Sequence, residues 1–516
     1  MSFLESLVSV ANDYLWNYFL LFLLCGAGIY FTFRLRFVQV RRFGQSCKEV
    51  FGKIRFSGKK AGDDGMSSFQ SLATAVAAQV GTGNLAGAAT AIVMGGPGAI
   101  FWMWLSAFFG MATIFAEASL AQAHRTQKDG AVIGGPVYYI KAAFKGRFGR
   151  VLAVLFSVFI ILALGFMGNM VQANSISSAF ATAFGANKLV VGIVIAVLAG
   201  FVFIGGIRRI ASLTEKIVPF MAVVYILGCA VALAFHAGSI GDAFRQIFVG
   251  AFSPTAVLGG ACGIGVQKAM RYGVARGLFS NEAGMGSTPH AHALAQVEHP
   301  CQQGVVAMMG VFIDTFVVLT LTALVILTSG QYGSGADGIE LTQAAFTATF
   351  GSFGNSFIAI CLLFFAFSTI VGWFFFGQQN IVYLFGKKAV LPYALLVVGF
   401  IVLGSLLKLE LVWSLADLFN GLMVIPNLLG LLALSGSAPA STATTPGPPC
   451  SPRPKRDRSD PFHNKKGPRP RLWSRALFCF LAVAYFCASC RNSTRRILPL
   501  MVLGSSSTNS TIRGYL

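Results

Sequence analysis

The chain has 516 residues, of which 55% are hydrophobic, and a mean hydropathy of +0.70. This composition excludes a soluble globular protein and predicts an all-α polytopic membrane protein. The net charge of +21 does not require a nucleic-acid partner, because Lys and Arg also collect in the cytoplasmic loops of membrane proteins. The ten cysteines include a single CxxC pair, Cys487 and Cys490, and with no second pair at metal-ligand spacing they predict neither a disulfide framework nor a metal site.

The N-terminal stretch MSFLESLVSVANDYLWNY has acidic residues and no basic segment ahead of its apolar run, so the first span is predicted to be retained rather than cleaved. Apolar runs predict about eleven transmembrane helices, near 14–33, 67–94, 97–122, 151–182, 188–206, 215–236, 260–290, 304–329, 355–385, 390–407 and 411–434. The loop between the first two runs is strongly basic and is predicted to be cytoplasmic, which places the N-terminus outside. Residues 1–66 are therefore expected to form the first span and a basic cytoplasmic loop.

The second apolar run contains Val80-Gly81-Thr82-Gly83-Asn84, which disfavours a continuous helix. Two glycines add backbone entropy, and Asn84 places an amide where hydrocarbon would surround it. Non-helical backbone at membrane depth is tolerated where it lines a cavity or is buried in protein. A discontinuous helix that carries a ligand site is therefore predicted, with close packing of small residues against another helix as the alternative.

A second interrupted run lies at 260–290, where Gly277, Gly284, Gly286 and Pro289 break the helical pattern. It is the fifth predicted span after the first broken helix. Residues 67–236 and 237–435 are therefore expected to form two five-helix repeats of opposite orientation, each opening with a broken helix. This layout is typical of secondary transporters whose site lies at the membrane midplane.

Residues 436–516 differ from the rest, with many Ser, Ala, Thr and Pro and with 13 Lys and Arg against 2 Asp and Glu. They predict a basic low-complexity tail, either a cytoplasmic segment attracted to anionic lipid headgroups or a frame-shifted segment that begins near Gly436. The abrupt change of composition where the last span ends favours the frame shift.

Several motifs in order resemble the alanine/glycine:cation symporter family: GGPGAIFWMW (95–104), VGTGNLAG (80–87), FAEASLA (115–121), GGPVYYI (134–140), RGLFSNEAGMGSTPHAHA (276–293) and FAFSTIVGWFFFGQQNIVYLFG (365–386). The resemblance covers residues 1 to about 435 and not the tail. It implies the amino acid/sodium symporter-type fold, a multi-pass protein of the bacterial plasma (inner) membrane, and coupled transport of alanine or glycine with sodium. No other cofactor is implied.

A small zwitterionic substrate needs amides for its carboxylate and oxygens for its ammonium group. In the first broken helix, Gly81 and Gly83 would let backbone approach the ligand, and Gln79 and Thr82 could bind its polar groups. Thr74, earlier on this helix, is a further candidate. In the second broken helix, Phe279 could accept a methyl group and exclude longer side chains, with Ser280 and Asn281 beside it. For all of these residues the alternative is helix packing.

Sodium prefers hard oxygen ligands, by analogy with other hard cations. Val80 and the side-chain oxygen of Asn84 are the candidates in the first break. Ser368 and Thr369 would ordinarily bond to their own helix, but the resemblance implies that they face the first broken helix and bind sodium. Trp373, one turn later, is expected to cap the substrate pocket, with an interfacial or packing tryptophan as the alternative.

Charged residues within predicted spans are costly and are therefore candidates for a role. Glu117 and Asp314 are expected to pair with a buried Arg such as Arg271 or Arg276, while Glu282 is left open between cation binding and pairing. His290 and His292 lack a further ligand at useful spacing, so they predict a cytoplasmic helix end and not a metal pair.

The predicted function is a sodium-driven symporter for alanine or glycine that works by alternating access. The alternative is a proton-coupled permease for small amino acids. An ion channel with GTGN as its filter is disfavoured, because filters repeat around a symmetric pore. An enzyme is not expected, because the sequence has neither GxSxG nor HExxH.

Overall fold

The computed structural model describes residues 3–52, 65–128, 131–253, 265–407 and 409–436. The predicted tail beyond residue 436 and part of the basic 53–64 loop lie outside the described residues. So does the segment 254–264, which belongs to the second predicted repeat. The two repeats, 67–236 and 237–435, therefore stay predictions in their bounds.

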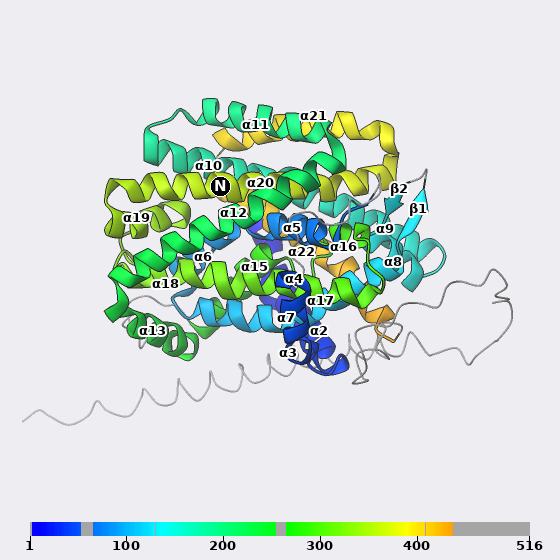
Figure 1. Ribbon diagram of the computed structural model, residues 1–516, viewed down its shortest axis with the longest axis horizontal. Coiled ribbons are helices and arrows are strands. Elements are labelled where there is room, and N and C mark those ends of the chain that lie inside the picture. Colours follow the sequence, from blue (N-terminus) through cyan, green and yellow to red (C-terminus); the bar gives the residue numbers. More distant parts are fainter. Residues whose placement is uncertain (1–2, 53–64, 129–130, 254–264, 408, 437–516) are drawn as a thin grey trace, which may run out of the picture. The chain divides into compact units, whose positions relative to one another are not determined.

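The described chain is almost wholly helical (Figure 1). Its α-helices are α1 (Phe3–Tyr14), α2 (Leu21–Arg34), α3 (Val38–Arg41), α4 (Phe43–Phe51), α5 (Ser68–Gln79), α6 (Ala88–Gly95), α7 (Ala99–Ala123), α8 (Pro136–Ala143), α9 (Arg147–Ile160), α10 (Asn169–Phe184), α11 (Lys188–Ile204), α12 (Gly206–Phe235), α13 (Ile240–Phe252), α15 (Val266–Asn281), α16 (Pro289–Leu294), α17 (Pro300–Val311), α18 (Thr320–Thr328), α19 (Gly338–Phe350), α20 (Ser352–Phe385), α21 (Val390–Leu406) and α22 (Leu409–Leu434).

Short segments of other geometry join some of these helices. The π-helical segments are η1 (Leu15–Leu20), η2 (Gly83–Gly87), η3 (Ile161–Gly168) and η5 (Phe312–Leu319), and the 3₁₀ turns are η4 (Ala237–Ser239) and η6 (Lys387–Ala389). Strands β1 (Thr126–Lys128) and β2 (Ala131–Ile133) pair antiparallel in a small hairpin that the sequence did not predict. Because π-helical turns are frequent at functional sites, η2 and η5 are of particular interest.

Seven helical segments of the described chain are long and apolar enough to cross a membrane, and the bent pair Ser68–Gln79 and Gly83–Gly95 makes up to eight. The bend between the two parts of that pair is 46°. The shorter apolar helices α2 and α11 fall below the length criterion. The all-α polytopic prediction is confirmed, whereas the number of eleven spans stays a prediction.

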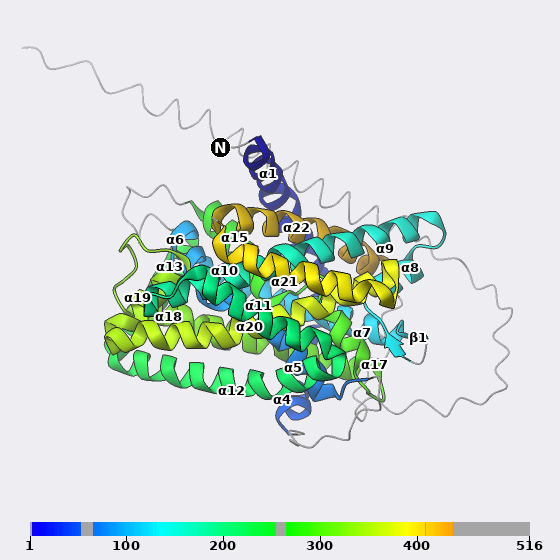
Figure 2. The same ribbon diagram turned by 90° about the horizontal axis from the view of Figure 1, so that it is seen from above.

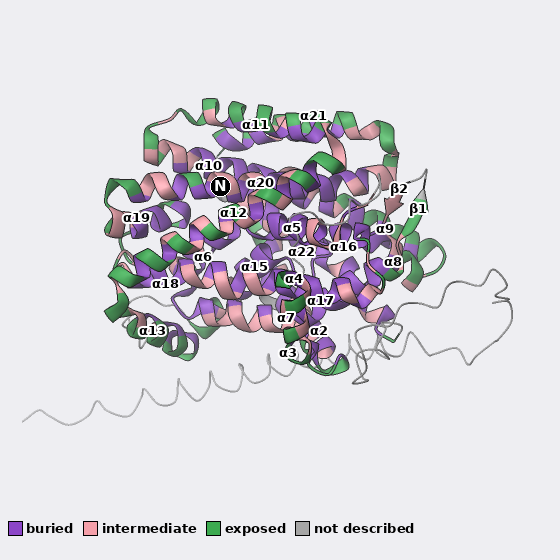
Figure 3. Cartoon of the chain, in the orientation of Figure 1, coloured by how far each residue is buried: buried purple, intermediate pink, exposed green. Residues whose placement is uncertain are grey.

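The broken helices lie in the interior, and the most exposed apolar surface belongs to outer helices such as α11, α12 and α21 (Figure 3). Helices α11 and α21 pack against each other and α10 packs against α20 and α21 (Figures 1 and 2). Val197, Phe220 and Leu395 are exposed on the outer helices. Apolar side chains of this kind suit a hydrocarbon environment, while the polar residues are gathered inside.

The start of the first broken helix is bonded to the end of the second. Met66 N–H donates to the Leu294 carbonyl (3.1 Å) and Gln296 N–H donates to the Met66 carbonyl (3.0 Å). Arg125 adds a bond from its guanidinium to the Ala295 carbonyl (2.6 Å), and partial burial there lowers the pKa of Arg125. Ser67 and Gln70 cap α5 reciprocally, which fixes where this helix begins. Hydrogen bonds thus join the start of the first broken helix to the end of the second, and the two helices contact each other again at their breaks.

Candidate substrate and sodium site

The first break spans Val80 to Thr82, between the end of α5 and the start of η2. Val80 is extended (φ −81°, ψ 93°), so the regular hydrogen bonds of the helix stop there. Two of the freed amides are satisfied by side chains: Gly81 N–H donates to Asn84 Oδ1 (3.0 Å) and Thr82 N–H donates to Gln172 Oε1 (3.2 Å). All of these residues are buried. The break is therefore a defined structure held by amide side chains.

Gly81 in this break and Gly83 at the start of η2 are required by neighbouring helices. A Cβ on Gly83 would lie 2.9 Å from Ser280 Cα of α15, and one on Gly81 would collide with Thr369 Oγ1 of α20 and lie 3.2 Å from Gln172 Oε1. The predicted role of Gly81 and Gly83, close approach of backbone to a ligand, stays a prediction. What the structure gives is a close approach of α15 and α20 to the break.

The second break follows Asn281 at the end of α15. Glu282 has a left-handed backbone (φ 56°), and Gly284 and Gly286 also have positive φ. The chain then restarts in α16, whose first residue is Pro289. Glycine adopts positive φ without steric cost, so the glycines in this segment were a clear sign of the break in the sequence.

The two breaks are joined through Gln79 and Asn281. Gln79 Nε2 donates to the Asn281 carbonyl (2.7 Å), and the Asn281 amide in turn donates to Thr315 Oγ1 (3.2 Å). Gln79 and Asn281, predicted from opposite halves of the chain as substrate-binding residues, are thus in direct contact. Phe279 precedes Asn281 by two residues on α15.

Three buried polar atoms at or beside the first break have no hydrogen-bond partner in the described structure: Gln79 Oε1, Thr82 Oγ1 and Gln172 Nε2. A buried polar atom without a partner is unfavourable unless a ligand or water satisfies it. One acceptor, one hydroxyl and one donor suit a zwitterion, which carries both an ammonium group and a carboxylate. Gln172 was not predicted, although its polar neighbours Asn169 and Asn174 in an apolar run were a usable signal.

Five oxygens gather where α20 crosses the end of α5. Thr369 Oγ1 lies within hydrogen-bond distance of the carbonyls of Ala77 (2.9 Å), Phe365 (3.0 Å) and Val80 (3.4 Å), to any of which its single proton can be donated. Ser368 Oγ lies within the same reach of the carbonyls of Phe365 (2.8 Å) and Ala77 (3.4 Å). Three carbonyls and two hydroxyls form a donor set of hard oxygens, which fits sodium.

Asn84, the other predicted sodium ligand, belongs to a different group. Its Oδ1 accepts from Gly81 N–H, and its Nδ2 donates to Asp314 Oδ1 at 2.7 Å. Ser280 Oγ and Thr315 Oγ1 also donate to the Asp314 carboxylate, at 2.9 Å each. Asp314, from η5, therefore joins both broken helices through one buried carboxylate.

The expected pairing of the buried carboxylates with arginine is wrong. Arg271 pairs with Asp13 (2.8 Å) and Arg276 pairs with Asp417 (2.8 Å), because these faces of α15 lie toward α1 and α22. Asp314 and Glu117 form no ion pair with the Lys and Arg of the described segments. Glu117 accepts instead from Gly284 N–H (3.1 Å) and from Asn427 Nδ2 (2.5 Å), which ties α7 to the second break.

Aromatic rings close one side of the joint. Phe279 meets Trp373 edge-on, with ring centroids 5.6 Å apart, and packs against Trp413 at 4.7 Å. Trp373 is fully buried and its indole N–H donates to Glu282 Oε1. We refer to Phe279 and Trp373 as the aromatic wall.

Thr74 does not join this group. Its hydroxyl donates to the Gln70 carbonyl (2.8 Å) and contacts Thr214 Oγ1 of α12 at 3.0 Å.

The two histidines of α16 form hydrogen bonds away from the first break. His290 contacts the Ser287 carbonyl (2.7 Å) and Asn380, whereas His292 contacts Gln303. The described residues contain no group of three or more His, Cys, Asp and Glu that could hold a metal ion.

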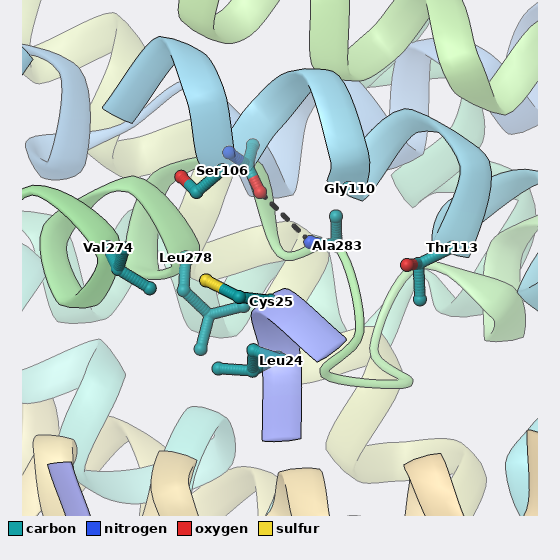
Figure 4. A pocket seen from close by; sticks show the side chains of 9 residues that line it. Leu24, Cys25, Ser106, Gly110, Thr113, Val274, Leu278 and Ala283 are labelled. Carbon is teal, nitrogen blue, oxygen red and sulfur yellow. Dashed lines mark hydrogen bonds between the residues drawn. The ribbon is translucent and has the colours of Figure 1, made fainter. Parts of the chain in front are cut away.

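A small cavity of about 20 Å³ lies next to the second break, between α2, α7 and α15 (Figure 4). Leu24, Cys25 and Leu278 line its apolar side, and Ser106 and Thr113 contribute hydroxyls. The space suits a water molecule and is too small for an amino acid. It therefore does not mark the substrate position.

A larger cavity, of about 310 Å³, lies at the beginning of α5. Three carboxylates line it, from Glu49, Glu215 and Glu298, together with Gln296 and Gln302. Of these, Glu215 accepts from Gln70 Nε2 at 2.9 Å. None of the predicted site residues lines it.

These features define an all-α membrane protein with two broken helices meeting in its core. The chain matches the model of the sodium:alanine symporter family over residues 1–444, and it belongs to that family. It is 44% identical over 443 residues to "Sodium/alanine symporter AgcS" of Methanococcus maripaludis, covering 85% of this chain and 96% of that protein. It is 43% identical to "Probable sodium/glutamine symporter GlnT" of Bacillus subtilis, covering 84% and 88%.

Solved structures support the fold. The fold is similar to that of MhsT in complex with L-phenylalanine, with a TM-score of 0.54 and 15% identity, over 72% of this chain and 90% of that one. It is also similar to a sodium-coupled sialic acid symporter, with a TM-score of 0.52 and 14% identity, over 80% and 85%. The predicted family and symporter-type fold are confirmed. The chain is a multi-pass, sodium-coupled amino acid transporter, and it is not an enzyme.

Proposed function

We propose that the chain imports a small neutral amino acid, alanine or glycine, together with sodium by alternating access across a bacterial plasma membrane. The N-terminus lies outside in this proposal, as the basic first loop suggests. The observation that carries it is the joint between Gln79 and Asn281, beside which three buried polar atoms have no hydrogen-bond partner among the described residues. A substrate bound there would contact both broken helices at once.

The substrate's polar ends account for these polar atoms. Gln172 Nε2 is a free donor for a carboxylate, and Gln79 Oε1 is a free acceptor for an ammonium group. The aromatic wall supplies apolar surface for a methyl group and limits longer side chains. The relative named as a probable sodium/glutamine symporter, GlnT, shares 43% identity with this chain, and in this proposal local differences in the aromatic wall account for size selection.

Sodium would be held by the carbonyls of Ala77, Val80 and Phe365 with the hydroxyls of Ser368 and Thr369. In the structure these hydroxyls lie within hydrogen-bond distance of those carbonyls. When a cation binds, the oxygen lone pairs of both the hydroxyls and the carbonyls would point toward it. Such an ion connects α5 to α20 directly beside Gly81, whose amide belongs to the first break. Occupancy by sodium would thus favour the backbone arrangement that binds substrate, which couples the two binding equilibria.

Asp314 supports a second cation position, with Asn84 as the predicted ligand beside it. The Asp314 carboxylate is buried and has no ion-pair partner in the described chain, so its charged form would be stabilised by a sodium ion and its neutral form would carry a proton. A relative from Bacillus subtilis at 38% identity is described as "Putative sodium/proton-dependent alanine carrier protein YrbD". Proton coupling is therefore the second candidate function.

The test is uptake of labelled alanine into proteoliposomes that contain the full chain. An inward sodium gradient should drive saturable uptake, and unlabelled glycine should compete while glutamine should not. Uptake driven by a pH gradient and indifferent to sodium would replace sodium by the proton as coupling ion. Absence of uptake under both gradients, in correctly inserted protein, would overturn the proposal.

A further inference from the structure

Glu282 occupies an unusual place in the second break. It is the first residue after α15, and its left-handed backbone (φ 56°, ψ 13°) is one that glycine adopts more readily than glutamate. Arg36 and Phe37 are the other described non-glycine residues with positive φ. Two glycines follow within four positions, at Gly284 and Gly286, so this segment otherwise uses glycine where φ is positive. A glutamate retained under these conditions points to a need for its side chain.

The side chain of Glu282 connects two elements. Oε1 accepts a hydrogen bond from the indole N–H of Trp373 in α20, and Oε2 accepts one from Ser287 Oγ at 2.5 Å. The residue is fully buried and forms no ion pair with the basic side chains of the described segments. The hydrogen bond from Ser287 fixes one oxygen of the carboxylate, so that the other oxygen is held toward the indole.

Trp373 is confined on its remaining sides. A Cβ on Gly168 of η3 would lie 2.6 Å from the Cε3 atom of the indole, so the ring lies directly against bare backbone. Phe279 meets the ring at 90° on another side. Those two contacts are apolar, and they restrict the position of the ring only by steric contact. Only the bond to Glu282 has a direction, because a hydrogen bond depends on the donor angle.

We propose that Glu282 is a positioning residue that sets the size limit of the substrate by fixing the indole of Trp373 in the aromatic wall. This inference rests on the proposed function, since it assigns to that wall the exclusion of longer side chains. Without the bond, the indole gains freedom to tilt away from Phe279. Space for an additional methylene then opens beside the substrate's methyl group, while the polar contacts of the breaks are unchanged.

A purely structural role makes a different prediction. A buried carboxylate that only stabilised the loop would, when removed, reduce transport of all substrates equally through loss of folded protein. A positioning role changes the relative rates for substrates of different size. The ratio of kcat/KM for alanine to that for 2-aminobutyrate, which is longer by one methylene, separates the two roles.

The experiment compares Glu282→Asn with Glu282→Gln in proteoliposomes under an inward sodium gradient. Asn tolerates the left-handed backbone but is one methylene too short to reach the indole, whereas Gln retains both the reach and an acceptor oxygen. Glu282→Asn should lower the alanine to 2-aminobutyrate ratio about tenfold, the discrimination that one methylene gives in a fitted pocket. Glu282→Gln should retain most of the ratio.

Two further variants complete the design. Glu117→Asn removes a buried carboxylate from the same break that does not contact Trp373, so it should lower uptake of both substrates and leave their ratio unchanged. Trp373→Phe removes the indole N–H, and its effect on the ratio should not add to that of Glu282→Asn, because both variants lose the same bond.

An unchanged ratio in Glu282→Asn would overturn the inference, as would full additivity with Trp373→Phe. Should Glu282→Asn fail to insert, Ser287→Ala decides: it frees the carboxylate and should shift the ratio in the same direction, and an unchanged ratio there would equally overturn the inference. Failure of the proposed function looks different, because the unmodified chain would then show no sodium-driven alanine uptake at all.

Discussion

The two helix breaks are stabilised by side chains of different chemistry. At the first, the freed amides of Gly81 and Thr82 are satisfied by neutral amide side chains, Asn84 and Gln172, and polar atoms are left without partners. At the second, carboxylates hold the loop: Glu117 accepts from Gly284 N–H, and Glu282 accepts from Ser287 and Trp373. The difference supports the proposal that the first break offers groups to ligands, while the second fixes the shape of the aromatic wall.

Thr369→Val should have the largest effect, because it deletes a hydroxyl at the oxygen group beside the first break while retaining the side chain's shape. Losing one interaction with a charged ligand costs about 2–3 kcal/mol, or roughly a hundredfold at the upper end. We expect the sodium concentration for half-maximal alanine uptake to rise accordingly. Thr328→Val is the matched control, because Thr328 Oγ1 also bonds to a carbonyl of its own helix (Leu324, 2.8 Å) away from the breaks. An equal rise in both variants would contradict the assignment.

Gly81→Ala should rank next. The added Cβ would collide with Thr369 Oγ1 and lie 3.2 Å from Gln172 Oε1, so the first break must shift. Overpacking of this kind costs about 1–3 kcal/mol, and at a ligand site we expect roughly a thirtyfold loss of uptake per inserted protein. Gly185→Ala, at a helix end with open space around it, tests backbone strain alone (φ 64°) and should leave uptake nearly unchanged. Wild-type uptake in Gly81→Ala would show that the break tolerates rearrangement.

The sequence predicted both breaks because glycine and amide residues stand out in an apolar run. It also singled out Gln79 and Asn281, which are in contact in the structure. Ser368 and Thr369 were named as sodium ligands only through the family resemblance, since a hydroxyl in a helix ordinarily bonds to its own backbone, and that role stays a prediction.

What the sequence did not predict depends on packing between distant elements. The Ala77 and Phe365 carbonyls have no side-chain signature, and Gln172 reaches Thr82 across 90 positions of chain. Thr74 was named as a substrate-binding candidate by its place in the sequence and stays a prediction, and its contact with Thr214 of α12 could not be predicted. The partners of Arg271 and Arg276 could not be predicted either, because they come from α1 and α22.

Gln172→Ala should raise the KM for alanine about tenfold, because Thr82 N–H loses its acceptor and the substrate loses a free donor. Asn174→Ala is the control on the same helix. Its Nδ2 donates to the Gly404 carbonyl (2.7 Å) and the Leu407 carbonyl (2.8 Å), which are packing contacts to the end of α21. We expect Asn174→Ala to lower thermal stability in detergent with little change in KM. A higher KM in the control and not in Gln172→Ala would reverse the assignment of the two residues.

Glu117→Gln should have the smallest effect on transport and a measurable effect on stability, because it tests the second break as a scaffold. Both carboxylate oxygens accept hydrogen bonds, from Gly284 N–H and from Asn427 Nδ2, and a Gln amide can accept only one of them. Its NH₂ group would then face a donor, which we expect to lower stability by about 1–3 kcal/mol. Thermal inactivation in detergent measures this loss, and sodium-dependent uptake per folded molecule should fall less than about threefold. Uptake abolished in a variant of unchanged stability would instead place Glu117 among the groups that bind a cation, and the two breaks would then share the same role.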